Sequence, residues 1–325
     1  MKKLQILVTQ YKESDEIVKH LLDSISLQQG IDFNNIGVII CNDGSPETAL
    51  SESLLNSYKF DINYYMEPHR GISGARNACL DHSDAEYIMF CDADDMFLNN
   101  CGLYMIKDEM TKGQFDFLMS TFVEQKPITQ DICAFINHED DCTFVHGKVY
   151  RRQFLIDNDI RWNEDLIYHE DHYFNVLCLE YSTDTRNCKM PFYLWKYRFD
   201  STVRDGGTYM LKTYPDWLKA NAALVDELIN RFKFGEAQFH VVKTIYSAYF
   251  DLDKPEWHDP KNKEYKEKAE QKVKWYYDKF QDIYDEVTAQ RSWEILKIAR
   301  DKITKQGKYL ESITFYDWIK HIEEL

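Results

Sequence analysis

The sequence predicts an α/β protein: a mostly parallel sheet flanked by helices, followed by a C-terminal helical subdomain. Short apolar runs of strand length alternate with stretches of helical periodicity over roughly the first 120 residues. Polar clusters follow three of these runs, at the strand ends where open α/β sheets bind ligands. From about residue 207, Lys, Glu and aromatic residues recur at helical spacing. We therefore expect an N-terminal domain over residues 1–205 and a helical subdomain over residues 206–325.

The expected elements follow from periodicity, in chain order. Apolar runs predict strands at Leu4–Thr9, Ile36–Cys41, Asn63–Met66, Tyr87–Cys91 and Phe115–Val123. Helices are expected after Ser14 and Asp15, where Ile17, Leu21, Leu22 and Ile25 share one face, then near Glu47–Tyr58, and from about Ser73. The region 124–205 is mixed.

The C-terminal part reads as helical segments. Apolar residues recur at helical spacing, as in Leu218, Leu224, Leu228 and Phe232, and again in Trp293, Leu296 and Ile303. Pro255, Pro260 and Gly307 are expected to break this part into segments. We interpret its aromatic stripe as core packing and not as a sugar-binding platform.

Composition limits the class of protein. A chain of 325 residues with 44% hydrophobic and 15% aromatic residues is typical of a globular fold. A net charge of −16 argues against broad nucleic-acid binding, because a polyanion requires a basic surface. No apolar run of about 18 residues predicts a membrane span, and Leu4–Val8 is too short for a secretory signal. The eight cysteines form no C-x-x-C pair, so we expect reduced thiols in a cytoplasmic protein.

The most informative segment is the strand Tyr87–Cys91 and the acidic turn that follows it. Asp92, Asp94 and Asp95 place three carboxylates in four positions. Carboxylates repel one another, so a cluster at a strand end favours a hard divalent cation such as Mg²⁺ or Mn²⁺. The alternative is an acidic turn that caps the next helix.

Two further polar clusters, Thr9–Tyr11 and Asn42–Ser45, also follow predicted strands. Parallel strands bring their carboxyl ends to one edge, so all three clusters should converge there. Other nucleotide and metal motifs are absent: no G-x-G-x-x-G follows the first strand, and there is no Walker A sequence. An EF-hand loop starting at Asp92 would need Gly and Glu where Phe97 and Leu103 stand.

These motifs, with two more, resemble those of a known family. Val8–Tyr11, Asn42–Ser45, Gly71–Asn77, Asp92–Asp95 and Glu170–Asp171 occur in the order and spacing of the family 2 glycosyltransferases. The resemblance covers roughly residues 1–205 and implies the GT-A fold. It also implies metal-dependent transfer of a sugar from a nucleoside-diphosphate donor, with inversion at the anomeric carbon.

The resemblance implies a set of donor-binding residues. These are Thr9, Tyr11, Glu13, Asp43, Arg76, Asp92, Ala93, Arg198 and Ser201. Tyr11 would contact the base or ribose, Asp43 would accept from a uracil N–H, and Arg76 would pair with the diphosphate. The alternatives are a turn residue for Asp43 and a surface ion pair for Arg76. His69–Arg70 departs from the family pattern, which leaves the roles of these two residues open.

Metal and base are assigned in the same way. Asp94 would hold the Mn²⁺ or Mg²⁺ ion that bridges the two phosphates, with Asp92 nearer the ribose and Asp95 in a supporting role. The family places its general base in an acidic pair that opens a helix, which matches Glu170–Asp171. Asp171 is the candidate base, with Glu170 orienting the site. The alternatives are acidic residues that only satisfy the helix dipole, and Asp165 as the base.

Two segments allow two interpretations each. Tyr193–Arg198, followed by Ser201, resembles a mobile loop that closes over the donor, where Arg198 and Ser201 would touch the diphosphate, or is an edge strand with alternating aromatics. His146 either helps to bind donor or acceptor or is structural.

The resemblance thus implies a glycosyltransferase with a UDP-sugar donor and a hydroxyl acceptor on a glycan, on a cell-surface polymer such as teichoic acid, or on a glycoprotein. The alternatives are an inactive sugar-nucleotide-binding scaffold and an enzyme acting on modified DNA bases. The three carboxylates Asp92, Asp94 and Asp171 argue against the first, and the acidic charge against the second. A nucleotidyltransferase would need a basic glycine-rich loop where Gln10–Glu13 stand. Homo-oligomerisation stays open.

Overall fold

The structure, a computed structural model, describes residues 2–129, 132–198, 208–284 and 313–325. The chain divides into two compact units, Met1–Phe199 and Asp200–Leu325. The expected domain boundary between residues 205 and 206 lies outside the described residues, so it stays a prediction.

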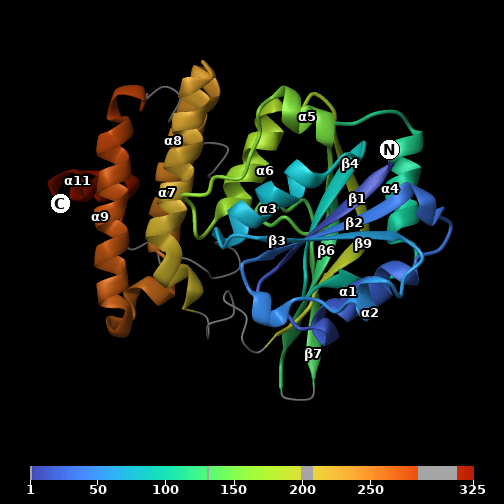
Figure 1. Cartoon of the computed structure of the whole chain (residues 1–325). Coiled ribbons are helices and arrows are strands. Elements are labelled where there is room, and N and C mark those ends of the chain that lie inside the picture. Colours follow the sequence, from blue (N-terminus) through green and yellow to red (C-terminus); the bar gives the residue numbers. More distant parts are fainter. Residues whose placement is uncertain (1, 130–131, 199–207, 285–312) are drawn as a thin grey trace. The chain divides into compact units, whose positions relative to one another are not determined.

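A mixed sheet forms the centre of the first unit (Figure 1). Its strands run in the order β3-β2-β1-β4-β8-β6-β9-β5, and β7 pairs with β6. Pairing is parallel across β3, β2, β1 and β4 and between β6 and β9, and antiparallel elsewhere. The strands are β1 (Leu4–Gln10), β2 (Ile36–Asp43), β3 (Asp61–Glu67), β4 (Tyr87–Asp92), β5 (Met96–Phe97), β6 (Phe117–Pro127), β7 (Cys133–His138), β8 (Lys148–Arg151) and β9 (Thr185–Trp195).

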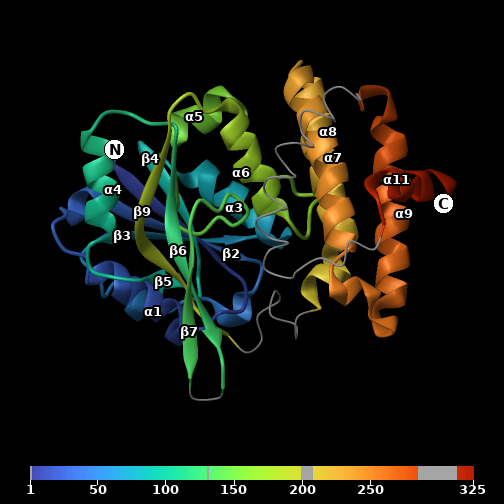
Figure 2. The same ribbon diagram turned by 180° about the vertical axis from the view of Figure 1, so that it is seen from behind.

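Helices cover both faces of this sheet (Figures 1 and 2). α3 packs on β1 and β2, while α1 and α4 pack near β5 and β9. Every residue of β1 and β2 is buried, as expected of parallel strands covered on both sides. The helices of this unit are α1 (Asp15–Ser26), α2 (Glu52–Leu55), α3 (Gly71–His82), α4 (Gly102–Thr111), α5 (Arg152–Asp157) and α6 (Glu170–Tyr181).

The predicted strands are all present, with ends that differ by one to four residues. The helix predicted near Glu47–Tyr58 is wrong in length. A 3₁₀ turn covers Pro46–Thr48, and α2 spans only Glu52–Leu55 after its cap Ser51, whose hydroxyl accepts from Leu54 N. Proline favours the first turn, and a serine that accepts from a downstream N–H starts a new helix, so the segment splits in two.

Part of the segment Tyr193–Arg198 is strand. Tyr193 and Leu194 pair with β5 and also with β6, so this end of β9 is an interior strand and not an edge. Arg198 lies just after β9 and is the last residue described before the gap at 199–207, so Ser201 lies outside the described residues.

The second unit is helical, as predicted. It contains α7 (Tyr209–Asn230), α8 (Phe234–Leu252), α9 (Lys263–Phe280) and α11 (Phe315–Glu324). Leu218, Leu224 and Leu228 are buried, but Phe232 follows the end of α7 and is 81% exposed, so its place in the apolar stripe was wrong. Trp293, Leu296, Ile303 and Gly307 lie outside the described residues.

Aromatic side chains form much of the core of this unit. Tyr214, Tyr249, Trp257 and Trp318 are all buried, and Tyr249 lies 5.5 Å from Trp318 between ring centroids. The interpretation of the aromatic stripe as core packing is therefore correct for these residues.

The structure also bears on the cysteines and on membrane crossing. All eight cysteines fall in the described ranges, and none forms a disulfide. Among the helices of the described residues, none has the length and apolar character that crossing a bilayer demands.

Candidate active site

The carboxyl ends of three parallel strands meet at one edge of the sheet, as predicted. In the strand register Thr9 lies opposite Asp92, and Gln10 lies opposite Asn42. Thr9 is buried there. The polar clusters that follow β1, β2 and β4 therefore share one site.

Asp94 lies on the acidic turn after β4 and faces a cation. Arg198 Nη1 lies 3.1 Å from Asp94 Oδ2 and 3.1 Å from Glu13 Oε1. Glu13 Oε2 in turn accepts from the backbone N of Tyr11 at 2.6 Å. Burial, then the negative charge of Asp92, raises the pKa of Asp94 to about 6, although Arg198 opposes the shift. Three predicted donor residues thus converge with the predicted metal ligand.

Asp95 is fully enclosed and supports the turn. Its carboxylate accepts from Tyr193 Oη at 2.6 Å and from the backbone N of Lys196 at 2.9 Å. Burial, with the charges of Asp94 and Asp92, raises its pKa well above the ordinary value. These contacts tie the acidic turn to β9.

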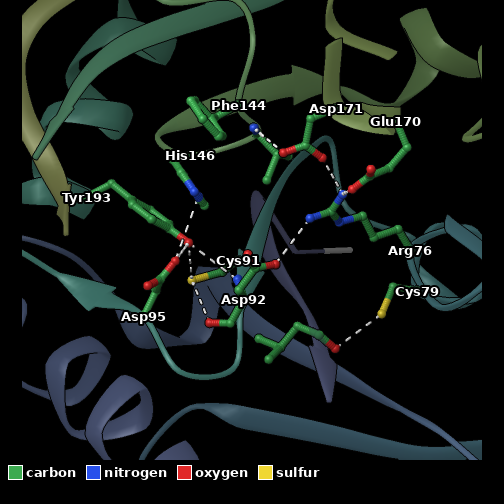
Figure 3. Close-up of polar contacts among 12 residues, drawn as sticks. Arg76, Cys79, Cys91, Asp92, Asp95, Phe144, His146, Glu170, Asp171 and Tyr193 are labelled. Atoms are coloured by element: carbon green, nitrogen blue, oxygen red, sulfur yellow. Dashed lines mark hydrogen bonds and ion pairs between the residues drawn. The ribbon is translucent and has the colours of Figure 1, made fainter. Parts of the chain in front are cut away.

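His146 lies beside this turn, buried among aromatic rings (Figure 3). Its Nδ1 is 3.7 Å from Asp95 Oδ2, and burial lowers its pKa to about 4. The potential ligand atoms of Asp92, Asp95 and His146 all lie within 4.8 Å of one another. His146 is thus a buried imidazole of lowered pKa next to Asp92, a predicted metal ligand, and Asp95, which was expected only in a supporting role.

The carboxylates fit a hard cation. They offer oxygen ligands, and the pKa of Asp94 is raised by burial and then by the charge of Asp92, a charge that a bound cation would offset. A guanidinium nitrogen of Arg198 already stands at hydrogen-bond distance from Asp94 and Glu13.

The predicted nucleotide residues lie at the ends of β1 and β2. Tyr11 is 42% exposed and stacks on His69 with ring centroids 4.8 Å apart. Asp43 is buried, and its carboxylate accepts from the backbone N of Arg70 at 2.7 Å and contacts His69 Nδ1 at 2.8 Å. His69 and Arg70, whose roles the sequence left open, therefore hold Asp43. A uracil contact to Asp43 stays a prediction.

Arg76 occupies the centre of the other half of the site (Figure 3). Its Nη1 donates to Glu170 Oε1 at 3.1 Å and to Asp171 Oδ1, and its Nη2 donates to Asp92 Oδ1 at 3.2 Å. The side chain is only 4% exposed. Burial lowers the pKa of Arg76, but the charges of Asp171, Asp92 and Glu170 outweigh burial and raise it.

Glu170 and Asp171, the acidic pair predicted to contain the general base, lie at the start of α6. His169 precedes them in the left-handed conformation, with φ of 61°, and so turns the chain into the helix. Asp171 Oδ2 accepts from the backbone N of Val145 at 2.9 Å. Burial, then the charge of Asp171, raises the pKa of Glu170 to about 8, against the effect of Arg76. Asp165, the alternative base, is exposed.

Three contributors were missed by sequence reasoning. Trp162 carries the guanidinium of Arg76 on its ring, 4.4 Å from the centroid, and stacks on Phe174 at 4.1 Å. Tyr193 holds Asp95, and Val145 holds Asp171 through its backbone. A tryptophan eight residues before an acidic pair is a weak signal, and a backbone donor leaves none. Ala93 is buried, so its side chain faces the fold.

Comparison with known proteins identifies the N-terminal part of the chain. Residues 5–161 match the family described as Glycosyl transferase family 2. The teichoic acid poly(glycerol phosphate) polymerase of Staphylococcus epidermidis is 29% identical over 211 residues, which is 59% of this chain and 28% of that protein. The poly(ribitol-phosphate) β-N-acetylglucosaminyltransferase TarS of Staphylococcus aureus is 25% identical over 193 residues, 54% of this chain and 32% of TarS. The chain thus spans less than a third of the length of these two relatives.

Solved structures share the fold. Residues 1–349 of S. aureus TarS align with a TM-score of 0.61 at 16% identity, covering 85% of this chain and 81% of that one. The same part of TarS in complex with UDP-GlcNAc gives a TM-score of 0.55 at 18% identity, covering 71% and 67%. A mannosyltransferase from Pyrobaculum calidifontis with GDP-Man and Mn²⁺ gives 0.51 at 12% identity, covering 69% and 64%. The expected GT-A fold is therefore confirmed.

Proposed function

Because this chain carries a glycosyl transferase family 2 domain with the GT-A fold, we propose that it is a metal-dependent, inverting glycosyltransferase. Its donor is a nucleoside-diphosphate sugar, with UDP as the nucleotide. Its acceptor is a hydroxyl of a cell-surface polymer of the teichoic acid type.

One observation carries this proposal. The acidic turn after β4 and the acidic pair at the start of α6 meet around Arg76, although Asp171 is 95 residues from Arg76 in the chain. One pair of carboxylates is thus available for a donor and its ion, and a separate carboxylate for an acceptor. A single-displacement transfer requires both: groups that bind the donor, and a carboxylate that takes the proton of the acceptor hydroxyl.

In this reaction the acceptor oxygen bonds to the anomeric carbon while the bond from that carbon to the diphosphate oxygen breaks. Asp171 takes the proton of the acceptor hydroxyl. Asp94 and Asp92 would hold Mn²⁺ or Mg²⁺, which when bound neutralises charge on the leaving nucleoside diphosphate. Tyr11 offers an exposed ring for stacking on the base.

The relatives support the choice of substrates. TarS has been solved with UDP-GlcNAc, and the mannosyltransferase with GDP-Man and Mn²⁺. Two relatives are named for teichoic acid or poly(ribitol-phosphate). These names favour a UDP-sugar and an alditol-phosphate polymer over the DNA-base and scaffold alternatives.

Thermal unfolding with UDP-, GDP-, CDP- and TDP-sugars, with and without Mn²⁺, identifies the donor, because a ligand of the folded state raises its apparent stability. Transfer is then measured as release of the nucleoside diphosphate in the presence of poly(ribitol-phosphate) or poly(glycerol-phosphate). Binding without turnover in the parent would favour the scaffold, and no binding of any nucleotide would refute the proposal.

Asp171→Asn tests the base. We expect transfer to fall at least about 100-fold with donor binding retained, because the amide cannot take the proton. Asp165→Asn is the matched control, since Asp165 is exposed and lies just before the acidic pair. Near-normal turnover by Asp171→Asn, or an equal loss in the control, would contradict the assignment.

A further inference from the structure

The terminal nitrogens of Arg76 are already occupied by partners within the protein. Its two terminal nitrogens already donate to carboxylates on three residues, Glu170, Asp171 and Asp92. Its Cζ lies over the ring of Trp162, 4.4 Å from the ring centroid. Its Nε is buried and has no hydrogen-bond partner among the described residues. The exposed part of the side chain is only 4%.

The charge around Arg76 also argues against a diphosphate. One positive charge faces three carboxyl groups at hydrogen-bond distance, and two of them, on Glu170 and Asp171, are 14% exposed. A phosphate oxygen that replaced the carboxylate of Asp171 at Arg76 would leave that buried group with only the backbone N of Val145 as a partner, beside another negative charge. Like charges so close are strongly unfavourable in a poorly hydrated site.

The same contacts fix the geometry of Asp171. One carboxylate oxygen accepts from Arg76, and the other accepts from the backbone N of Val145. With both oxygens held, the carboxylate has one orientation, and the remaining lone pairs face a defined direction. Through its second nitrogen, the same guanidinium is bonded to Asp92 on the donor side.

Resting on the proposed function, we propose that Arg76 is a positioning residue that sets the acceptor-activating Asp171 against the donor-side Asp92. In this role Arg76 does not bind the donor diphosphate. The interaction matters for the proton transfer, where an error in placement is costly, and hardly for donor affinity.

Arg76→Lys and Arg76→Ala separate the two roles. Lysine keeps the charge but has no planar fork to bridge three carboxyl groups. For both variants we expect the dissociation constant of UDP with Mg²⁺ to stay within about threefold of the parent, while kcat at saturating donor falls about 100-fold or more. Added guanidinium ion should restore part of the kcat of Arg76→Ala, which a loss of fold would not allow.

A matched control is Arg161→Lys. Arg161 forms a bidentate pair with Asp81 on the surface, at 2.5 and 2.8 Å, and lies next to Trp162 in the chain. We expect parent values of kcat and UDP affinity. Weakened UDP binding by the Arg76 variants with kcat retained would overturn the proposal, as would unchanged kcat.

If neither Arg76 variant folds, the parent protein decides. In a crystal structure with UDP and Mg²⁺, we expect the guanidinium of Arg76 to keep its three carboxyl partners. A diphosphate oxygen within hydrogen-bond distance of Arg76 would overturn the proposal. Failure of the parent itself to bind or turn over any nucleotide sugar would instead refute the proposed function.

Discussion

Glu170→Gln is expected to make the protein more resistant to unfolding at alkaline pH. The Glu170 side chain is largely buried at the start of α6, and its Oε1 accepts from Arg76 at 3.1 Å. Glutamine has nearly the same shape and keeps that acceptor oxygen. The substitution therefore removes a titrating carboxyl group without opening a cavity.

The magnitude follows from the shifted pKa. Burial first, and then the charge of Asp171, raises the pKa of Glu170 from 4.5 to about 8. A group whose pKa is higher in the folded than in the unfolded protein contributes stability that is fully present below the unfolded pKa. That stability is lost as the pH rises through the folded pKa. For Glu170 the window runs from 4.5 to about 8. Titration of Glu170 should lower the parent's free energy of unfolding by on the order of 2 kcal/mol between pH 6 and pH 8.5.

Urea unfolding of parent and variant at several pH values from 6 to 8.5 measures the effect. The free energy of unfolding of Glu170→Gln relative to the parent should rise by that amount across the range. Other groups that titrate there, such as Asp94 and Lys148, cancel in the difference. Glu16→Gln, at an exposed position on α1, is the control and should follow the parent. An identical fall in stability for Glu170→Gln and the parent would refute the reasoning.

Two further substitutions test other buried titratable groups. Lys148 is fully buried, and burial lowers its pKa from 10.5 to about 8, so its contribution to the free energy of unfolding falls as the pH drops from 10.5 through 8. Lys148→Met should therefore raise the free energy of unfolding by about 1–3 kcal/mol at pH 7. Thermal melts that show no gain in stability would contradict this prediction. Burial tends to raise the pKa of Asp116, but hydrogen bonds from Arg151 and Thr183 outweigh burial and lower it. Asp116→Asn should therefore lower the free energy of unfolding by about 2–4 kcal/mol at pH 7, and by less as the pH falls through the lowered pKa of Asp116. Urea unfolding of parent and variant at pH 7 and at acidic pH measures the difference. A difference that stays constant with pH would contradict the prediction.

The sheet edge was predictable because parallel strands obey simple geometry. Once the strands ending near Thr9, Asn42 and Asp92 are recognised, their carboxyl ends must meet. Apolar runs of strand length are a strong local signal in a sheet that is buried on both faces. The local errors arose where turn chemistry decides, as after Pro46, where a cap at Ser51 starts a second, short helix.

The partners of the charged residues were not predictable. Arg76 and Asp171 are 95 residues apart, and Arg198 and Asp94 are 104 apart. The meeting of Arg76 with Asp171 depends on how α6 docks, which involves packing such as that of Trp162 on Phe174. No local pattern encodes a contact of that kind. Motif order could indicate which residues belong to the site, but not which of them touch.

Burial distinguishes two arginines to which the sequence analysis assigned the same task. Arg76 and Arg198 were both expected at the diphosphate. Arg76 is 4% exposed and bonded to three carboxyl groups, whereas Arg198 is 26% exposed and faces Asp94 and Glu13. A partly exposed guanidinium can exchange a carboxylate for a phosphate at lower cost, because water reaches the guanidinium. A buried one would strand a charge. We therefore propose that Arg198 meets the donor diphosphate and that Arg76 serves the acceptor side of the site.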